Sequence, residues 1–175
     1  MRRVRSPETT AEFRGALRDA ADDLLGYFER RVSLRDDAAD LLAETMLQAW
    51  RRSEAMPSER DRRRMWLFTI AAHVLANHRR SARRRNALAE RLRQHLASPN
   101  EPDLAEANAV RDAVYRLPTA QRELVILIHW DGFSIVEAAE ILGLNASTAR
   151  SRYSKARTVL RQALTTATPR PTARP

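Results

Sequence analysis

Hydrophobic residues recur three and four positions apart along most of this chain, which is the spacing of amphipathic helices. The pattern predicts helices over residues 8–31, 36–52, 61–96, 104–117 and 120–130, and two more between Ser134 and Leu164. The chain has only four glycines and no run of alternating β-branched residues, so strands are not expected. We therefore predict an all-α fold.

The apolar positions also indicate which helix faces are buried. In residues 8–31 they are Phe13, Leu17, Leu24, Leu25 and Phe28, and Gly26 allows a break or bend. In residues 36–52 they are Leu42, Met46 and Trp50, flanked by Ala38, Thr45 and Ala49. The long helix is expected to bury a broad face between Met65 and Ala76, and residues 120–130 to bury Leu124, Leu127 and Ile128, with Thr119 as the N-cap.

One segment interrupts the helical pattern. Residues 97–103, ASPNEPD, contain two prolines, serine, asparagine and acids, and no hydrophobic residue that could anchor them. We predict two small helical domains, 8–96 and 104–164, joined by this flexible linker. Residues 165–175 are of low complexity and are predicted to be a disordered tail.

The C-terminal segment SIVEAAEILGLNASTARSRYSKARTVLRQAL predicts two helices with a tight turn between them. The first helix ends before Gly143, a residue type that tolerates a left-handed backbone. Asn145 follows in the N-cap position of the second helix. The buried face of that helix is expected at Ala149, Tyr153, Ala156, Leu160 and Leu164.

The opposite face of this second helix carries small hydroxyls and cations but no acid. Its members are Ser147, Ser151, Ser154, Lys155 and Thr158, with Arg150, Arg157 and Arg161 beside them. Short polar groups allow close approach to DNA, and cations suit phosphates and guanine edges. The alternative is an ordinary helical hairpin with a basic, solvated outer face.

Composition supports an anionic partner. The formal net charge is +9 and the pI is about 11.2, although 30 of the 31 basic residues are Arg, a bias that GC-rich coding would also produce. There is no Cys, which excludes disulfides and thiolate metal sites and fits a cytoplasmic protein. No apolar run is long enough to span a membrane, and the basic N-terminus lacks a secretory apolar region, so membrane insertion is not expected.

No catalytic constellation is visible. The four histidines show no metal-ligand spacing, and nucleophile elbows, phosphate loops and paired carboxylates are missing from the sequence. We therefore expect no enzyme activity, no cofactor and no metal, and interpret the histidines as structural or nucleic-acid-facing.

Two charged helix faces lie in the N-terminal half. Asp36, Asp40 and Glu44 are four apart, so they share one side of a helix, where like charges repel. They either pair with arginines elsewhere in the chain or face a basic partner. In the long helix, Arg79, Arg80, Arg83 and Arg84 share one side, which indicates either a solvated face or an anionic partner.

Three strings in this order resemble bacterial RNA polymerase sigma factors of the sigma-70 family, in the small two-domain extracytoplasmic-function (ECF) group. The string LPTAQRELVILIHWDGFSIVEAAEILGLNASTARSRYSKAR resembles region 4, a helix-turn-helix. The string DDAADLLAETMLQAW resembles region 2.2, and WLFTIAAHVLANHRRSARRR resembles regions 2.3 and 2.4.

The resemblance implies a promoter-specific transcription initiation factor with three binding surfaces. Contacts to the −35 element would come from Asn145, Ser147, Thr148, Arg150, Ser151, Arg152, Lys155 and Arg157. Contacts to the −10 element would come from Trp66, His73, Asn77, Arg79, Arg80, Arg83 and Arg84. Docking on the clamp coiled coil of the β′ subunit of core polymerase would use Asp37, Asp40, Glu44, Gln48 and Trp50. The family often uses an anti-sigma factor, which makes one a candidate partner.

The chain departs from the family pattern at a few positions. His73 replaces a usual Asn on the −10 surface, and Lys155 a usual Arg on the −35 surface. Ala43 and Met46 replace a common Gln and Phe in the docking helix. Two other functions stay open on sequence alone. One is a standalone helix-turn-helix regulator, and the other is a degenerate sigma paralogue that acts as a protein-interaction module.

Overall fold

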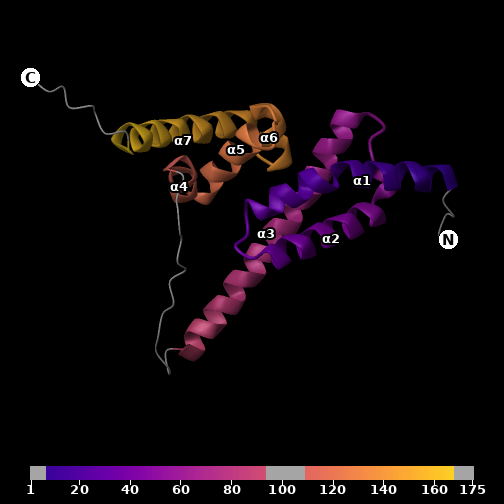
Figure 1. The fold of residues 1–175 in the computed structure, drawn as a ribbon, viewed down its shortest axis with the longest axis horizontal. Coiled ribbons are helices and arrows are strands. Elements are labelled where there is room, and N and C mark those ends of the chain that lie inside the picture. The colour runs from indigo at the N-terminus through magenta and orange to yellow at the C-terminus, as the bar shows by residue number, and fades with distance from the viewer. Residues whose placement is uncertain (1–6, 94–108, 168–175) are drawn as a thin grey trace, which may run out of the picture. The chain divides into compact units, whose positions relative to one another are not determined.

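The computed structural model describes residues 7–93 and 109–167, and within these ranges the chain forms helices and no strand (Figure 1). The predicted all-α fold is confirmed. The chain divides into two compact units, residues 1–97 and 98–175. The first contains α1 (Pro7–Glu29), α2 (Arg35–Arg51), the 3₁₀ turn η1 (Ser53–Ala55) and α3 (Arg60–Arg93). The second contains α4 (Ala109–Arg116), α5 (Thr119–His129), α6 (Ile135–Ile141) and α7 (Ala146–Ala167).

In the N-terminal unit, α1, α2 and α3 pack against one another around an aromatic core. Phe13, Leu24 and Phe28 are buried as predicted, and α3 buries its apolar face between Met65 and Leu75. The centre of this core is Tyr27, which the predicted face omitted. Its ring makes edge-to-face contacts with Phe28 (5.1 Å between centroids) and Phe68 (5.4 Å).

Helix α1 runs through Gly26 without a break. The glycine instead makes room for an arginine side chain. A Cβ atom at Gly26 would lie 2.9 Å from Nη1 of Arg30, so any other residue would displace that guanidinium.

The buried face of α2 is offset by one position from the prediction. Leu41, Thr45 and Ala49 are buried together with Ala38, whereas Leu42, Met46 and Trp50 are only partly buried. Helix α2 packs against both α1 and α3, and the two neighbours together determine which of its residues are buried. Thr45 tolerates burial because its hydroxyl donates to the Leu41 carbonyl (2.7 Å).

In the C-terminal unit, α5 packs against α4, α6 and α7. Leu124 and Leu127 are buried as predicted, but so are Val125 and Ile126, and Ile128 is only partly buried. Neighbours on several sides bury more of α5 than one amphipathic face. The helix begins at Thr119 itself, with Pro118 in the N-cap position and no side-chain cap, so the predicted cap is wrong.

The predicted linker 97–103 lies outside the described residues, as do 94–96, 104–108 and most of the predicted tail. The predicted C-terminal domain end at Leu164 lies within the described residues. Helix α7 passes it and continues to Ala167. No helix in the described part of the chain is long and apolar enough to cross a membrane.

Gly143→Ala should lower the free energy of unfolding of the C-terminal unit by about 1 kcal/mol, because its φ of +63° lies in the left-handed region. Gly15→Ala in α1 is the matched control. Both glycines have nothing within 4 Å of an added Cβ, but Gly15 is helical, without a positive φ. Alanine there should instead stabilise its unit by up to about 1 kcal/mol.

Hydrogen exchange read by mass spectrometry reports the two units separately and so measures both changes in one experiment. Unchanged protection of α6 and α7 in the Gly143→Ala protein would contradict the assigned role of this glycine.

Candidate functional site

The turn between α6 and α7 is fixed by backbone and capping hydrogen bonds. Ser134 and Glu137 form a capping box at the start of α6, with the Glu137 N–H donating to Ser134 Oγ (3.3 Å) and the Ser134 N–H to Glu137 Oε2 (2.7 Å). After α6, the Gly143 N–H donates to the Glu140 carbonyl and the Leu144 N–H to the Ala139 carbonyl. This is a Schellman ending with the glycine in the left-handed position, so the direction of the chain into α7 is set locally.

Asn145 caps α7 as predicted. Its Oδ1 accepts from the Thr148 N–H (2.7 Å) and from the Ser147 hydroxyl (2.8 Å). Below the cap, Ala149 and Ala156 are completely buried, and Tyr153 and Leu160 pack against the core cluster of the unit. The helices α6 and α7 therefore form a helix-turn-helix whose second helix has a fixed outer face.

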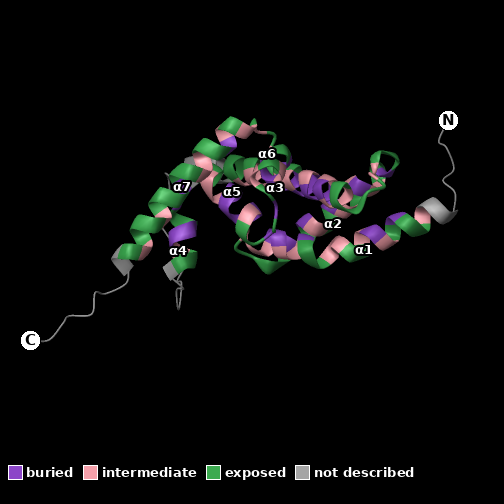
Figure 2. Cartoon of the chain, turned by 90° about the horizontal axis from the view of Figure 1, so that it is seen from above, coloured by how far each residue is buried: buried purple, intermediate pink, exposed green. Residues whose placement is uncertain are grey.

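That outer face of α7 is exposed, as the green positions of Figure 2 show. Exposed residues are Asn145, Ser147, Arg150, Ser151, Ser154, Lys155, Arg157, Thr158 and Arg161, and the half-buried Thr148 and Arg152 lie beside them. None of the cations on α7 forms an ion pair with a described residue. The face therefore holds positive charge that no described carboxylate of its own unit pairs with.

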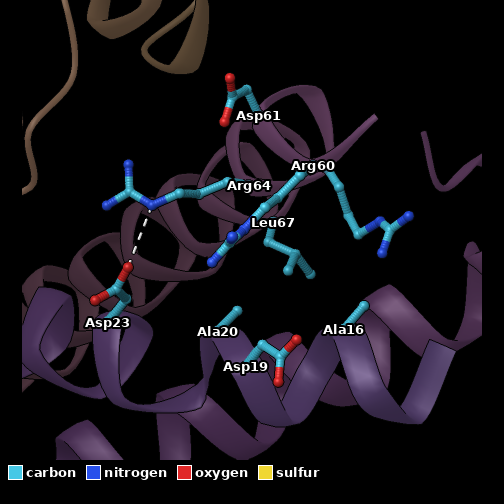
Figure 3. Close-up of a pocket in the computed structure, with 9 residues that line it drawn as sticks. Ala16, Asp19, Ala20, Asp23, Arg60, Asp61, Arg64 and Leu67 are labelled. Carbon is cyan, nitrogen blue, oxygen red and sulfur yellow. Dashed lines mark hydrogen bonds and ion pairs between the residues drawn. The ribbon is translucent and has the colours of Figure 1, made fainter. Parts of the chain in front are cut away.

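Arginines near the start of α3 behave differently. The Arg63 guanidinium bonds Glu12 of α1 (3.2 Å) and also donates to the carbonyls of Pro57 and Ser58 (3.0 and 2.7 Å). Arg64 bonds Asp23 (3.2 Å, dashed in Figure 3). Arg63, Arg64 and Asp23 line an open cleft of about 380 Å³ between α1 and α3, and the cleft contains both signs of charge. Arg63 and Arg64 thus fasten α3 and the preceding loop to α1.

The predicted −10 residues are spread along one helix, from Trp66 to Arg84 of α3, over about 27 Å at the usual helical rise. His73, Asn77, Arg80, Arg83 and Arg84 are exposed, whereas Trp66 and Arg79 are half-buried. Arg80 donates to Asn77 Oδ1, and Arg84 donates to Ser81 Oγ (3.2 Å). Those two arginines are therefore held by neutral groups of their own helix.

The predicted docking residues lie on α2. Asp40 and Glu44 are exposed, and Asp37 and Gln48 are half-buried, with Gln48 donating to Glu44 Oε1 (2.9 Å). None of the acids on α2 pairs with a described cation, so internal neutralisation of this face is not observed in that part of the chain.

Trp50 differs from the other docking candidates because it also belongs to the fold. Its ring makes an edge contact with Phe13 of α1 (5.4 Å between centroids). The sequence interpretation missed Leu47, which is 43% exposed on α2. Its place four residues after Ala43 and seven after Asp40 could have identified it as an apolar member of the acidic face.

The described parts of the chain contain no group of three His, Asp or Glu side chains that could hold a metal ion. The geometry defines a protein with a helix-turn-helix whose second helix is cationic. A separate helical unit has one acidic and one arginine-rich helix.

Comparisons with known proteins identify the family. Residues 17–85 match Sigma-70 region 2, and residues 107–160 match Sigma-70, region 4. The chain is 32% identical over 142 residues to the ECF RNA polymerase sigma factor SigL of Mycobacterium tuberculosis, covering 76% of this chain and 79% of SigL. It is 36% identical over 131 residues to SigC of the same species, covering 70% and 68%.

Solved structures agree with this assignment. The sigma factor RpoE of Bartonella quintana, in complex with the anti-sigma factor NepR, aligns with a TM-score of 0.59 at 27% identity, over 91% of this chain and 98% of RpoE. CnrH, in complex with the cytosolic domain of CnrY, aligns with a TM-score of 0.52 at 25% identity, over 92% and 88%.

The chain belongs to the ECF group of RNA polymerase sigma factors. It is therefore a transcription initiation factor that binds core RNA polymerase and directs promoter-specific initiation. Matches to both regions favour this function over a standalone helix-turn-helix regulator and over a degenerate paralogue.

Proposed function

We propose that α7 reads the −35 element, α3 binds the −10 element and α2 docks on core polymerase. The observation that carries this proposal is the distribution of ion pairs. Arg63 and Arg64 are paired with acids of α1, whereas the cations of α7 and the acids of α2 form no ion pair with a described residue. Charges left without a partner within a unit are available to a partner of opposite sign.

On α7, the short polar side chains and the cations are assigned to two kinds of DNA contact, to base edges and to the phosphate backbone. Ser147, Arg150, Ser151 and Lys155 lie on the exposed face and are assigned to base edges in the major groove. Arg152 and Arg157, together with the capping end at Asn145 and Thr148, are assigned to the phosphate backbone. Lys155 acts as a point charge because it lacks the planar fork of arginine.

On α3, the exposed Arg80, Arg83 and Arg84, with the half-buried Arg79 beside them, support binding of the −10 element. A melted strand keeps its phosphates, which Arg79, Arg80, Arg83 and Arg84 would contact. His73 and Asn77, exposed between Trp66 and these arginines, are assigned to the bases. Because an imidazole replaces the amide usual in the family at residue 73, we expect the base preference there to differ.

On α2, exposed Leu47 lies on the same side as Asp40 and Glu44. An apolar residue next to acids suits a partner helix that carries apolar and basic side chains. The clamp coiled coil of the β′ subunit is the proposed partner. Asp37 and Gln48 extend the contact, and Trp50 supports it by packing on Phe13.

The remaining assignments follow from the partners. The chain supplies no chemistry of its own, because polymerase catalyses the reaction. It acts in the cytoplasm, where polymerase meets the promoter. An anti-sigma factor is a further proposed partner, since RpoE is in complex with one and CnrH is in complex with a cytosolic domain of CnrY.

Arg150→Ala should lower transcription from a −35-dependent promoter by about ten- to hundredfold, because a lost base contact costs on the order of 1–3 kcal/mol. Affinity for core polymerase should not change, since Arg150 lies in the other unit from α2. Run-off transcription measures the first quantity, and fluorescence anisotropy with labelled protein measures the second.

The matched control for Arg150→Ala is Arg161→Ala, an exposed arginine further along the same helix that also makes no ion pair with a described residue. It should have a much smaller effect. Equal loss of core binding and transcription in the Arg150→Ala protein would contradict the proposed division between the units.

Glu44→Arg should weaken binding to core polymerase by about tenfold or more, because it places a cation against a basic partner. DNA recognition by α7 should be retained. Asp22→Arg is the control, since it makes the same charge change at an exposed acid of α1 in the same unit. Titration of core polymerase with each protein gives the affinities, and equal losses in the two variants would refute the assignment of α2.

A further inference from the structure

His129, at the end of α5, contacts the recognition helix through Tyr153. His129 Nε2 and the Tyr153 hydroxyl lie 2.9 Å apart, at hydrogen-bonding distance. The two rings are also stacked, with centroids 5.9 Å apart and planes 28° from parallel. On the same tyrosine, the guanidinium carbon of Arg157 lies 6.0 Å from the ring centroid. We call these three residues the His129–Tyr153–Arg157 stack.

The position of Tyr153 is fixed at both ends of its side chain. Its ring packs against the buried cluster of Val114, Leu117, Val125, Ile126 and Ala156. Its hydroxyl reaches out of that cluster to His129. An aliphatic residue could fill the same apolar space, but it could neither bond His129 nor offer a ring face to a cation.

Arg157 lies one helical turn after Tyr153 and is exposed. It forms no ion pair with a described residue, and its guanidinium carbon lies within cation–π distance of the tyrosine ring. A cation–π contact leaves guanidinium N–H groups that can donate to a phosphate.

We infer that His129 is a positioning residue for DNA recognition, acting through Tyr153 to orient Arg157. The inference rests on the proposed role of Arg157 as a phosphate contact. An arginine that is already restricted loses less rotamer freedom when it binds, so affinity rises without a new contact. His129 itself lies on α5 and needs no contact with DNA.

A double-mutant cycle tests this mechanism directly. The full-length protein, reconstituted with core polymerase, is titrated with a duplex selected by that holoenzyme from a random-sequence library. The cycle combines His129→Phe, which keeps a ring but loses the hydrogen bond, with Arg157→Ala. A parallel cycle combines His129→Phe with Arg150→Ala, because no hydrogen bond, ion pair or ring contact joins Arg150 to the stack among the described residues.

Arg157→Ala should weaken DNA binding by about tenfold and His129→Phe by about threefold. In the Arg157→Ala protein, His129→Phe should change the affinity by less than about 1.5-fold, because its effect passes through the missing arginine. In the Arg150→Ala protein, His129→Phe should retain its full effect. Hydrogen-exchange protection of α7 shows whether each variant keeps its fold.

The same threefold loss in the Arg157→Ala background would overturn the inference, because His129 would then act by another route. If Arg157→Ala alone has no effect while Arg150→Ala weakens binding, the inference is wrong but the proposed function of α7 stands. If neither arginine matters, both are wrong. Should His129→Phe disturb the fold, Tyr153→Phe removes the same hydrogen bond, keeps both rings and enters the same cycle.

Discussion

A chain with 31 basic and 22 acidic residues cannot neutralise every cation internally, so the placement of its carboxylates decides which surfaces stay charged. Glu12 and Asp23 of α1 pair with Arg63 and Arg64, and this fastens α3 and the loop before it. The acids of α2 are not used in this way, and the exposed face of α7 has none. Surface ion pairs contribute little stability in water. Their main effect here is that Arg63 and Arg64 are occupied by acids of α1, whereas the cations of α7 remain available to an external anion.

The second constraint is the rigid turn before α7. Backbone hydrogen bonds at Gly143 and Leu144 and the Asn145 cap satisfy the ends of both helices without help from a distant part of the chain. Complete burial of Ala149 and Ala156 then fixes the rotation of α7 about its axis. Its exposed cations therefore lie on the open side of the helix before DNA is present, which reduces the ordering cost of binding.

Local signals in the sequence were enough to predict much of this fold. Helix periodicity, Gly143 and Asn145 depend on residues close in sequence, and the outer face of α7 was predictable because one side of that helix is covered and the other is open. The buried faces that were predicted wrongly depend on distant contacts. Two neighbours set the buried face of α2, and several bury most of α5.

The candidate site shows the same limit. The exposure of Arg150 and Lys155 was predicted from spacing, whereas the contact between His129 and Tyr153 joins residues on different helices and has no signature in periodicity. Leu47 was missed because the charges around it dominated the interpretation of α2. The pairing of Arg63 and Arg64 with acids also depends on the packing of α1 against α3, which only the three-dimensional structure shows.

The most direct test of the central claim is run-off transcription with purified protein, sigma-free core polymerase and the DNA upstream of the chain's own gene, with several genomic fragments alongside. We expect specific transcripts that require both this protein and core polymerase, with start sites downstream of a −35 and a −10 element. If the protein forms no complex with core polymerase and yields no transcript from any fragment, the assignment as a promoter-specific initiation factor is contradicted.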